Sequence, residues 1–180
     1  RAYCASIPVV ELGDRRLEAD LLYGVAFING QLENQPRALE LGRQALDLYR
    51  SLGLRREEIR VLQMLAVRSS ASAELFKALD YYDQAEALAE FNSPTGAAVL
   101  TLHKGALLGR LGEFERALQS LAQALEVFRA AVAKYREPNL LLFQAVALAA
   151  TARIQQSVGN HSEALDHLLP ALEIAREIKH

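Results

Sequence analysis

Apolar residues recur along the chain at the spacing of an α-helix. One such stripe consists of Leu118, Leu121, Leu125, Phe128 and Val132. Steps of three and four residues place side chains on one face of a helix. No stretch of the sequence alternates apolar and polar residues for long enough to predict a strand. The pattern therefore predicts an all-α protein.

Glycine, asparagine and proline divide this pattern into separate helices. Gly30, Gly112 and Gly159 are expected to end helices, because glycine tolerates the left-handed conformation of a helix end. Asn34 and Ser93 stand just before a first-turn proline and are expected to be N-caps. The expected helices span residues 16–30, 35–51, 55–71, 74–91, 95–111, 114–136, 139–158 and 161–178.

The chain also repeats itself at intervals of about 40 residues, as helical-repeat proteins do. In each repeat a small residue in the first helix is followed by two alanines in the second. These sets are Ala26/Ala38/Ala45, Ala66/Ala78/Ala85, Gly105/Ala117/Ala124 and Ala152/Ala164/Ala171. Small side chains allow paired helices to approach closely, so each repeat is expected to be a helical hairpin.

The repeat boundaries follow from a second set of residues that tolerate the left-handed conformation. This set is Gly13, Gly53, Asn92 and Asn139, each expected to end a helix. One hairpin cannot bury its apolar face alone, and about three are needed for a stable array. The predicted repeats cover residues 14–53, 54–92, 93–138 and 139–178 in one repeat domain, with residues 1–13 as the remnant of a preceding helix.

The third repeat resembles the tetratricopeptide repeat family. The residues that carry the resemblance are Leu102, Gly105, Leu108, Gly112, Phe114, Ala117, Leu121 and Ala124, although Lys104 stands where the family has leucine. The units are longer than the family's usual length of about 34 residues. In this they are similar to the repeats of bacterial transcription and signalling regulators. The resemblance implies a right-handed α-solenoid whose first helices line a concave groove.

The same resemblance implies which residues would line that groove and contact a partner. Position by position they are Asp20, Tyr23, Phe27, Arg60, Gln63, Met64, Val67, Leu102, His103, Ala106, Arg110, Ala149, Arg153 and Gln156. An apolar groove with three arginines suits an amphipathic helix, or an extended segment with a few acidic residues. We therefore expect a protein or peptide partner.

Composition and charge exclude several other classes of protein. The 180-residue chain has 20 basic and 22 acidic residues, too balanced to attract a nucleic-acid backbone. Its most apolar stretch, Leu140 to Ala152, is shorter than the roughly 20 residues of a membrane span and is expected to be a buried helix. Cys4 is the only cysteine, which fits a reducing, cytoplasmic location. We expect no membrane association.

The sequence offers little for catalysis or metal binding. His161 and His167 do not share a helical face, so they are not expected to form a pair of metal ligands. Asp80 and Asp83 share a face, but no candidate pocket accompanies them. His103 would tune a groove near neutral pH. We expect a non-catalytic protein without metal or cofactor.

Two features stand out near the C-terminus. Extra residues within Arg129–Glu137 predict a second helix extended by about two turns in the third repeat. Pro170 is expected to kink or interrupt the last helix. Leu168, Leu172 and Ile178 would leave an apolar face without a polar capping helix. Either more protein follows, in which case the chain is a fragment, or terminal repeats pair in a homodimer.

Two functions remain open on this evidence. The first is a scaffold or regulatory module that binds a protein or peptide in its groove. The second is a sensor domain that binds a small ligand or signal peptide and relays it to an attached output domain. The sensor would need a small pocket around Tyr23, Phe27, Gln63 and His103 rather than a long open groove.

Overall fold

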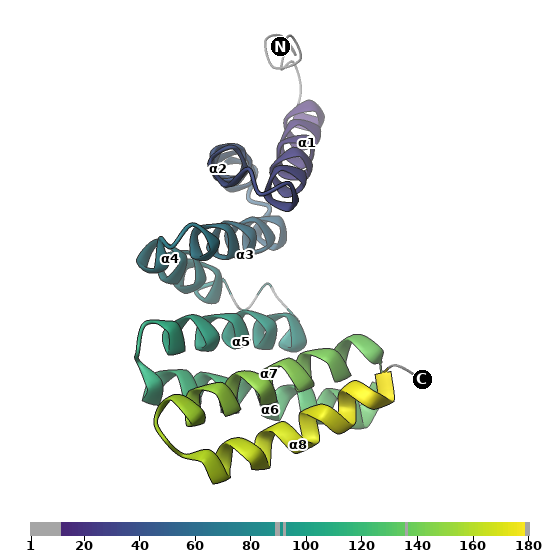
Figure 1. Ribbon diagram of the computed structural model, residues 1–180. Helices are drawn as coiled ribbons and strands as arrows, with labels where there is room; N and C mark the ends of the chain where they lie inside the picture. Colours follow the sequence, from purple (N-terminus) through teal and green to yellow (C-terminus); the bar gives the residue numbers. More distant parts are fainter. Residues whose placement is uncertain (1–11, 89–90, 92, 136, 179–180) are drawn as a thin grey trace. The chain divides into compact units, whose positions relative to one another are not determined.

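The computed structural model describes residues 12–88, 91, 93–135 and 137–178, which form eight α-helices and no strand (Figure 1). The helices are α1 (Leu12–Gln31), α2 (Gln35–Ser51), α3 (Arg55–Ala71), α4 (Leu75–Glu86), α5 (Pro94–Arg110), α6 (Phe114–Tyr135), α7 (Pro138–Ser157) and α8 (His161–Ile178). The all-α prediction is confirmed.

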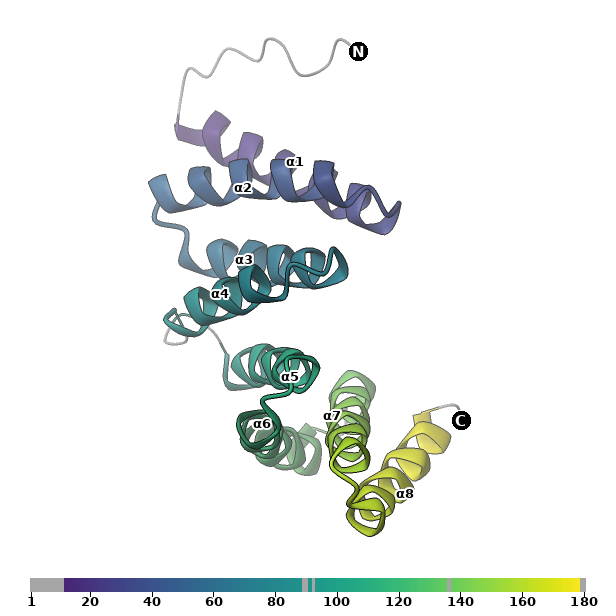
Figure 2. The ribbon, with the colours of Figure 1, turned by 60° about the vertical axis from the view of Figure 1, so that its left-hand side comes forward.

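Consecutive helices pair as hairpins, and the chain divides into two compact units, Arg1–Leu88 and Ala89–His180. In the first unit α1 packs on α2, α2 on α3 and α3 on α4, and the first helices α1 and α3 also touch (Figure 2). The second unit repeats this arrangement with α5 to α8. Each unit is thus a stack of two hairpins. That the four hairpins make one domain, and that their superhelix is right-handed, stays a prediction.

The small-residue sets form the cores of the hairpins, as predicted. The eight alanines of the second helices and the four small residues of the first helices are all buried. The fit is close at Gly105, where an added Cβ would lie 3.0 Å from Leu121 Cγ and 3.2 Å from the Ala117 carbonyl oxygen. A side chain at Gly105 would therefore push α5 away from α6.

The same turn closes five of the helices. A residue with positive φ follows the helix at Glu33, Gly53, Ala73, Gly112 and Gly159. After α5, for example, the Gly112 N–H donates to the Gly109 carbonyl at 3.3 Å, and the next N–H donates to the Leu108 carbonyl at 3.0 Å. This is the Schellman pattern, which satisfies the last carbonyls of a helix. Gly53, Gly112 and Gly159 therefore end helices as predicted.

Three of the other predicted helix ends are wrong, and one lies outside the described residues. Gly13 lies inside α1, Asn139 lies in the first turn of α7, and Asn92 is not described. Gly30 is inside α1 as well, and Glu33 takes the left-handed position in its place. The expected remnant of a preceding helix, residues 1–13, lies largely outside the description, because α1 begins at Leu12.

Gly30 has a different physical role, which is close approach to α3. Arg68 Nη1 donates a hydrogen bond to the Gly30 carbonyl oxygen at 2.7 Å. A Cβ at Gly30 would lie only 2.6 Å from Arg68 Nε, so the side chain of Arg68 occupies the space that glycine leaves. A glycine in a helix can thus be required by a neighbour rather than by the end of the helix.

The two predicted N-caps differ. The Ser93 hydroxyl accepts a hydrogen bond from the Gly96 N–H at 3.0 Å, so this cap is confirmed. Asn34 occupies the N-cap position of α2, but its side chain donates to Asn29 Oδ1 at 3.2 Å instead of capping the helix. Proline lies in the first turn in both cases.

Helix lengths vary more than the repeat suggests. The α6 helix has 22 residues, which confirms the extension predicted in the third repeat. The α4 helix has only 12 and ends at Glu86, five residues before the predicted end at residue 91. Pro170 lies inside α8, which remains helical on both sides of it, so the expected interruption does not occur.

Candidate partner-binding surfaces

In the first unit, three of the predicted groove residues come together on α1 and α3. The guanidinium carbon of Arg60 lies 4.8 Å from the centre of the Tyr23 ring, and the rings of Tyr23 and Phe27 are 6.4 Å apart. A cation over an aromatic face is attracted by the ring's negative charge distribution. Phe27 remains 44% exposed. The three side chains form a partly exposed aromatic and cationic patch.

Asp20, predicted beside this patch, also links α1 to α2. Its carboxylate accepts a hydrogen bond from the Tyr49 hydroxyl at 2.6 Å and lies 3.9 Å from Arg16 Nε. Tyr49 is fully buried, and burial together with the Asp20 carboxylate raises the pKa of its hydroxyl above its usual value. Tyr49 therefore stays a neutral donor. Asp20 has a structural role in addition to any contact with a partner.

Two of the predicted groove residues are buried, so their assignment to a contact surface is corrected. Met64 is 6% exposed and Leu102 is 1% exposed. Met64 packs toward α2, where its Cε would lie 2.8 Å from a Cβ added at Gly42. Side chains enclosed in this way stabilise the unit but are not available to a partner. Gln63 and Val67, the other predicted residues of α3, are half-buried.

In the second unit, the predicted residues lie on α5 and α7, which touch each other and run in the same direction (Figure 1). On α5, His103 and Ala106 are half-buried and Arg110 is exposed. Burial lowers the pKa of His103 below its usual value of 6.5. His103 is therefore neutral at neutral pH, and the expectation that it would tune the groove there is not supported.

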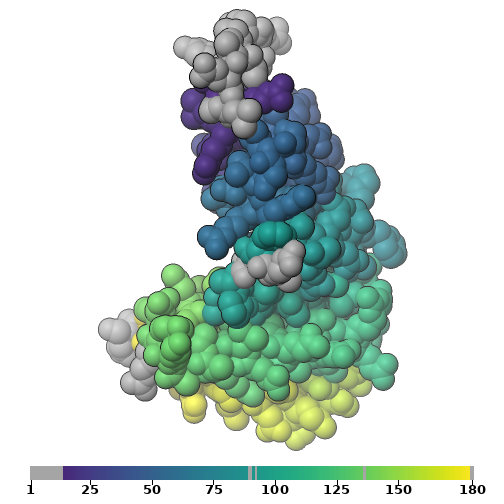
Figure 3. Space-filling model, turned by 180° about the vertical axis from the view of Figure 1, so that it is seen from behind, coloured from purple at the N-terminus to yellow at the C-terminus, as the bar shows by residue number. Residues whose placement is uncertain are grey.

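On α7 the predicted residues Ala149, Arg153 and Gln156 are all exposed. The same helical face carries two further exposed residues that were not predicted, Leu142 at 50% exposure and Val146 at 44%. Both residues lie at helical spacing from Ala149 and Arg153, which the sequence shows. They were not assigned to the surface because the segment Leu140 to Ala152 was expected to be a buried helix. The end of α6 and the start of α7, in green, lie at the surface in Figure 3.

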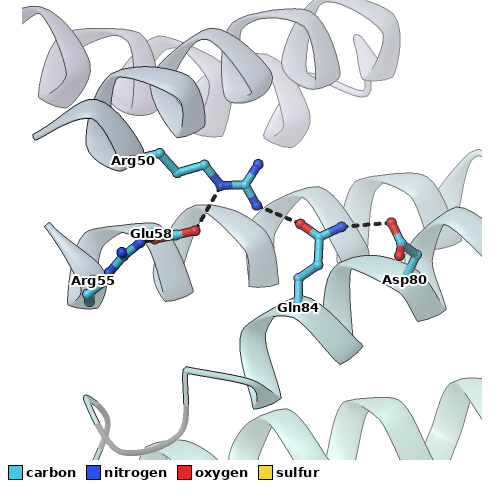
Figure 4. Close-up of polar contacts among 5 residues, drawn as sticks. All are labelled: Arg50, Arg55, Glu58, Asp80 and Gln84. Carbon is cyan, nitrogen blue, oxygen red and sulfur yellow. Dashed lines mark hydrogen bonds and ion pairs between the residues drawn. The ribbon is translucent and has the colours of Figure 1, made fainter. Parts of the chain in front are cut away.

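The hairpins of the first unit are tied together by a polar network (Figure 4). From the end of α2, Arg50 donates to Glu58 of α3 at 2.8 Å and to Gln84 of α4 at 2.6 Å. Arg55 donates to the other carboxylate oxygen of Glu58 at 2.8 Å, and Gln84 donates to Asp80 at 2.7 Å. Asp80, which shares a helical face with Asp83 and was considered above for catalysis, thus belongs to a structural network.

Glu58 is the centre of this network, with only 4% of its surface exposed. Burial alone would raise the pKa of its carboxyl. The hydrogen bonds from Arg50 and Arg55 outweigh that effect and hold the pKa below the usual 4.5. Glu58 is therefore a buried, ionised carboxylate that joins α3 to α2, while Arg50 extends the network to α4.

Within the described ranges, no three residues of the histidine, cysteine, aspartate and glutamate types gather as a metal site would require. None of the helices in the described part of the chain has the length and apolar character needed to cross a membrane.

No protein-family model and no curated protein sequence matches the chain. Solved structures do. A Rap protein in complex with competence and sporulation factor is 19% identical, with a TM-score of 0.79 over 94% of this chain and 45% of that one. The Rap conjugation gene regulator of plasmid pLS20, in complex with the Phr* peptide, is 17% identical, with a TM-score of 0.73 over 96% and 45%.

A third similar structure is a signal transduction ATPase with numerous domains, which has a tetratricopeptide repeat sensor and comes from Pyrococcus horikoshii. It is 13% identical, with a TM-score of 0.79 over 96% of this chain and 25% of that one. The chain spans less than half the length of each of these three proteins. The fold is therefore that of the tetratricopeptide-like helical repeats.

Proposed function

We propose that the chain is a non-catalytic module that binds a protein or peptide along the first helices of its hairpins. It would act within a bacterial signalling or transcription regulator, in the cytoplasm. Two proteins of the same fold have been solved with a peptide or factor bound, which supports this class of partner. The observation that carries the proposal is the exposed row Leu142, Val146, Ala149 and Arg153 along one face of α7.

The chemistry of this row indicates what would bind it. Two exposed aliphatic side chains at helical spacing can pack against the apolar face of a partner helix, as in helix-in-groove recognition. Arg110 ends α5, and Arg153 lies about one turn before the end of the parallel helix α7. Both cations are thus at the same end of the surface. A suitable partner is amphipathic and acidic toward that end.

Charge reversal tests this surface. We would measure binding of a labelled 12-residue peptide with leucines on one helical face and glutamates on the other, and of its counterpart with lysine for every glutamate. The double variant Arg110→Glu with Arg153→Glu should weaken binding of the acidic peptide about tenfold or more, as loss of charge-assisted contacts worth 1.4 kcal/mol would do.

The matched control is Arg43→Glu with Arg176→Glu, which reverses two exposed arginines on the second helices α2 and α8. It changes the net charge by the same amount and should leave the affinity nearly unchanged. If both double variants weakened binding equally, the effect would come from the overall charge of the protein and not from the proposed surface. Unchanged affinity in the Arg110/Arg153 variant would refute the proposed surface.

A sensor domain is the alternative. The structure from Pyrococcus horikoshii has a tetratricopeptide repeat sensor, and the pLS20 regulator is in complex with a peptide. In this chain Tyr23, Phe27 and Gln63 belong to the first unit and His103 to the second, so the small pocket around them stays a prediction. A ligand that protects both units from hydrogen exchange would favour the sensor over an open surface.

A homodimer through the terminal repeats is a further part of the proposal. On α8, Leu168 is 43% exposed, Leu172 48% and Ile178 37%, and α1 exposes its own apolar row from Leu17 at 57% to Ile28 at 58%. Exposed apolar faces of this kind are typical of interaction surfaces. A monomer mass from light scattering at high concentration would contradict the dimer.

A further inference from the structure

A cleft opens in the second unit between α6, α7 and α8, on the opposite face of α7 from the row proposed to bind a peptide. It encloses about 320 Å³, at the small end of the roughly 300–1,000 Å³ of ligand pockets. Its walls come from α6, α7 and α8. The lining residues are Leu118, Ala122, Leu125, Glu126, Arg129, Thr151, Gln155 and His167.

One wall of the cleft carries two opposite charges. Glu126 and Arg129 lie one turn apart on α6, and both are exposed to solvent. Within the part of the chain that the structure describes, neither forms an ion pair or a hydrogen bond. Other exposed carboxylates one turn from an arginine do pair in this chain, as Glu40 does with Arg37 at 2.8 Å. The cleft thus presents an anion and a cation side by side, each available to a ligand.

The remaining walls offer an apolar floor, the imidazole of His167 on α8 and two polar side chains of α7. Leu125 is 5% exposed and forms the floor with Leu118 and Ala122. On α7, Gln155 Oε1 accepts a hydrogen bond from Asn160 at 2.9 Å, and its amide nitrogen is a further donor in the lining. Thr151 donates to the Ala147 carbonyl at 3.0 Å and keeps its oxygen as an acceptor.

We propose that this cleft binds a free α-amino acid with an apolar side chain. The ammonium group would pair with Glu126 and the carboxylate with Arg129, while the side chain would pack on the floor around Leu125. Such a ligand satisfies both charges at once, as a simple acid, amine or phosphate does not. The volume of an amino acid suits the cleft. A nucleotide fits less well, because its negatively charged phosphates would lie beside the Glu126 carboxylate.

Phenylalanine and two derivatives, each lacking one charge, test the site. L-phenylalanine should bind at least about tenfold more tightly than N-acetyl-L-phenylalanine or L-phenylalaninamide in calorimetric titrations, because each derivative loses one charge-assisted contact worth 1.4 kcal/mol or more. Glu126→Gln should abolish the preference over the acetylated form only. Arg129→Gln should abolish the preference over the amide only. This crossed pattern is specific to a ligand held by both charges.

The matched controls are Glu173→Gln and Arg176→Gln, an exposed pair of opposite charges at the same spacing on α8, outside the cleft. They should leave all three affinities unchanged, and circular dichroism should show every variant to be folded. Equal binding of the three compounds, no saturable binding of phenylalanine or leucine, or an effect of the control variants equal to that of the cleft variants would each overturn the proposal. The peptide surface on α5 and α7 is unaffected by any of these outcomes.

Discussion

The two units are built from the same pair of hairpins but differ in what links their helices. In the first unit, Arg50 joins three helices through Glu58 and Gln84, and Arg68 bonds to the backbone of α1 at Gly30. In the second unit, aromatic packing links α6 to α7: the ring of Phe128 stacks on the ring of Phe143 with centroids 5.7 Å apart. One repeat pattern therefore supports two kinds of packing.

This difference between the units indicates which charged side chains are available to bind a partner or ligand. In the first unit several charged side chains link helices in addition to the apolar core, and Asp20 is one of them through Tyr49. In the second unit, apolar packing leaves Arg153 on α7 and Arg129 on α6 without a structural partner among the described residues. The row on α7 that is proposed to bind a peptide and the proposed ligand cleft therefore both lie in the second unit.

The largest expected effect comes from the apolar core of the second unit. Phe128 is fully buried, and Phe128→Ala should lower the free energy of unfolding by about 3–5 kcal/mol. Urea denaturation followed by circular dichroism measures the change. The control is Phe76→Ala in the first unit, where the ring is 77% exposed; it should change stability by less than about 0.5 kcal/mol. Similar losses from the two variants would contradict the assigned core.

The next effect is the removal of charge from the polar network. Glu58→Gln should cost about 1–2 kcal/mol, because a charged acceptor of two hydrogen bonds is lost while its arginine partners regain water. The side chains of Arg50 and Arg55 are 41% and 44% exposed, which limits the loss. Glu40→Gln, at a carboxylate that is 52% exposed, should have almost no effect. Equal losses of stability from Glu58→Gln and Glu40→Gln would show that the network stabilises the fold no more than an exposed ion pair does.

Acid should weaken the two units in different pH ranges. His103 has a lowered folded pKa, so its contribution is lost as the pH falls below 6.5, where the unfolded chain takes up the proton first. Glu58 also has a lowered folded pKa, so its contribution is present above 4.5 and is lost below it. Hydrogen exchange against pH should show α5 loosening before α3. His103→Gln should remove the first step only, and the reverse order would contradict the comparison.

The smallest effect concerns the turns, which use glycine in the second unit but not throughout the first. Ala73 has φ of 60°, a conformation that costs an alanine about 1–2 kcal/mol. Ala73→Gly should therefore raise the free energy of unfolding by roughly 0.5–1 kcal/mol after the gain in freedom of the unfolded chain is subtracted. Ser72→Gly, at a neighbour with φ of −84°, should give no gain. Destabilisation by Ala73→Gly would show that the turn is not strained.

Much of the fold could be predicted from the sequence, because it depends on periodic features. The helices follow the apolar spacing, and the alanines identified by the repeat are buried where expected. The errors came where a residue type has two possible roles. Gly30 provides space for Arg68 and does not end the helix. Glu33 adopts the left-handed conformation, which the residue type glutamate does not predict.

Less of the candidate site could be predicted, because exposure depends on contacts between helices. The resemblance to tetratricopeptide repeats placed Met64 and Leu102 on the predicted surface, but their neighbours enclose them. Periodicity missed Leu142 and Val146, since an apolar row looks the same whether it is covered or open. The link from Arg50 to Gln84 had no signal in the sequence, because it joins residues that only the stacking of hairpins brings together.

The central claim is that a partner packs along α7 between Leu142 and Arg153, and photocrosslinking tests it most directly. A benzophenone amino acid would replace Val146 in one variant and Leu169 of α8 in another, two apolar residues that are 44% and 58% exposed. With the acidic leucine–glutamate peptide, the label at 146 should crosslink strongly and the label at 169 weakly. Equal crosslinking at both positions, or crosslinking at 169 alone, would contradict the account.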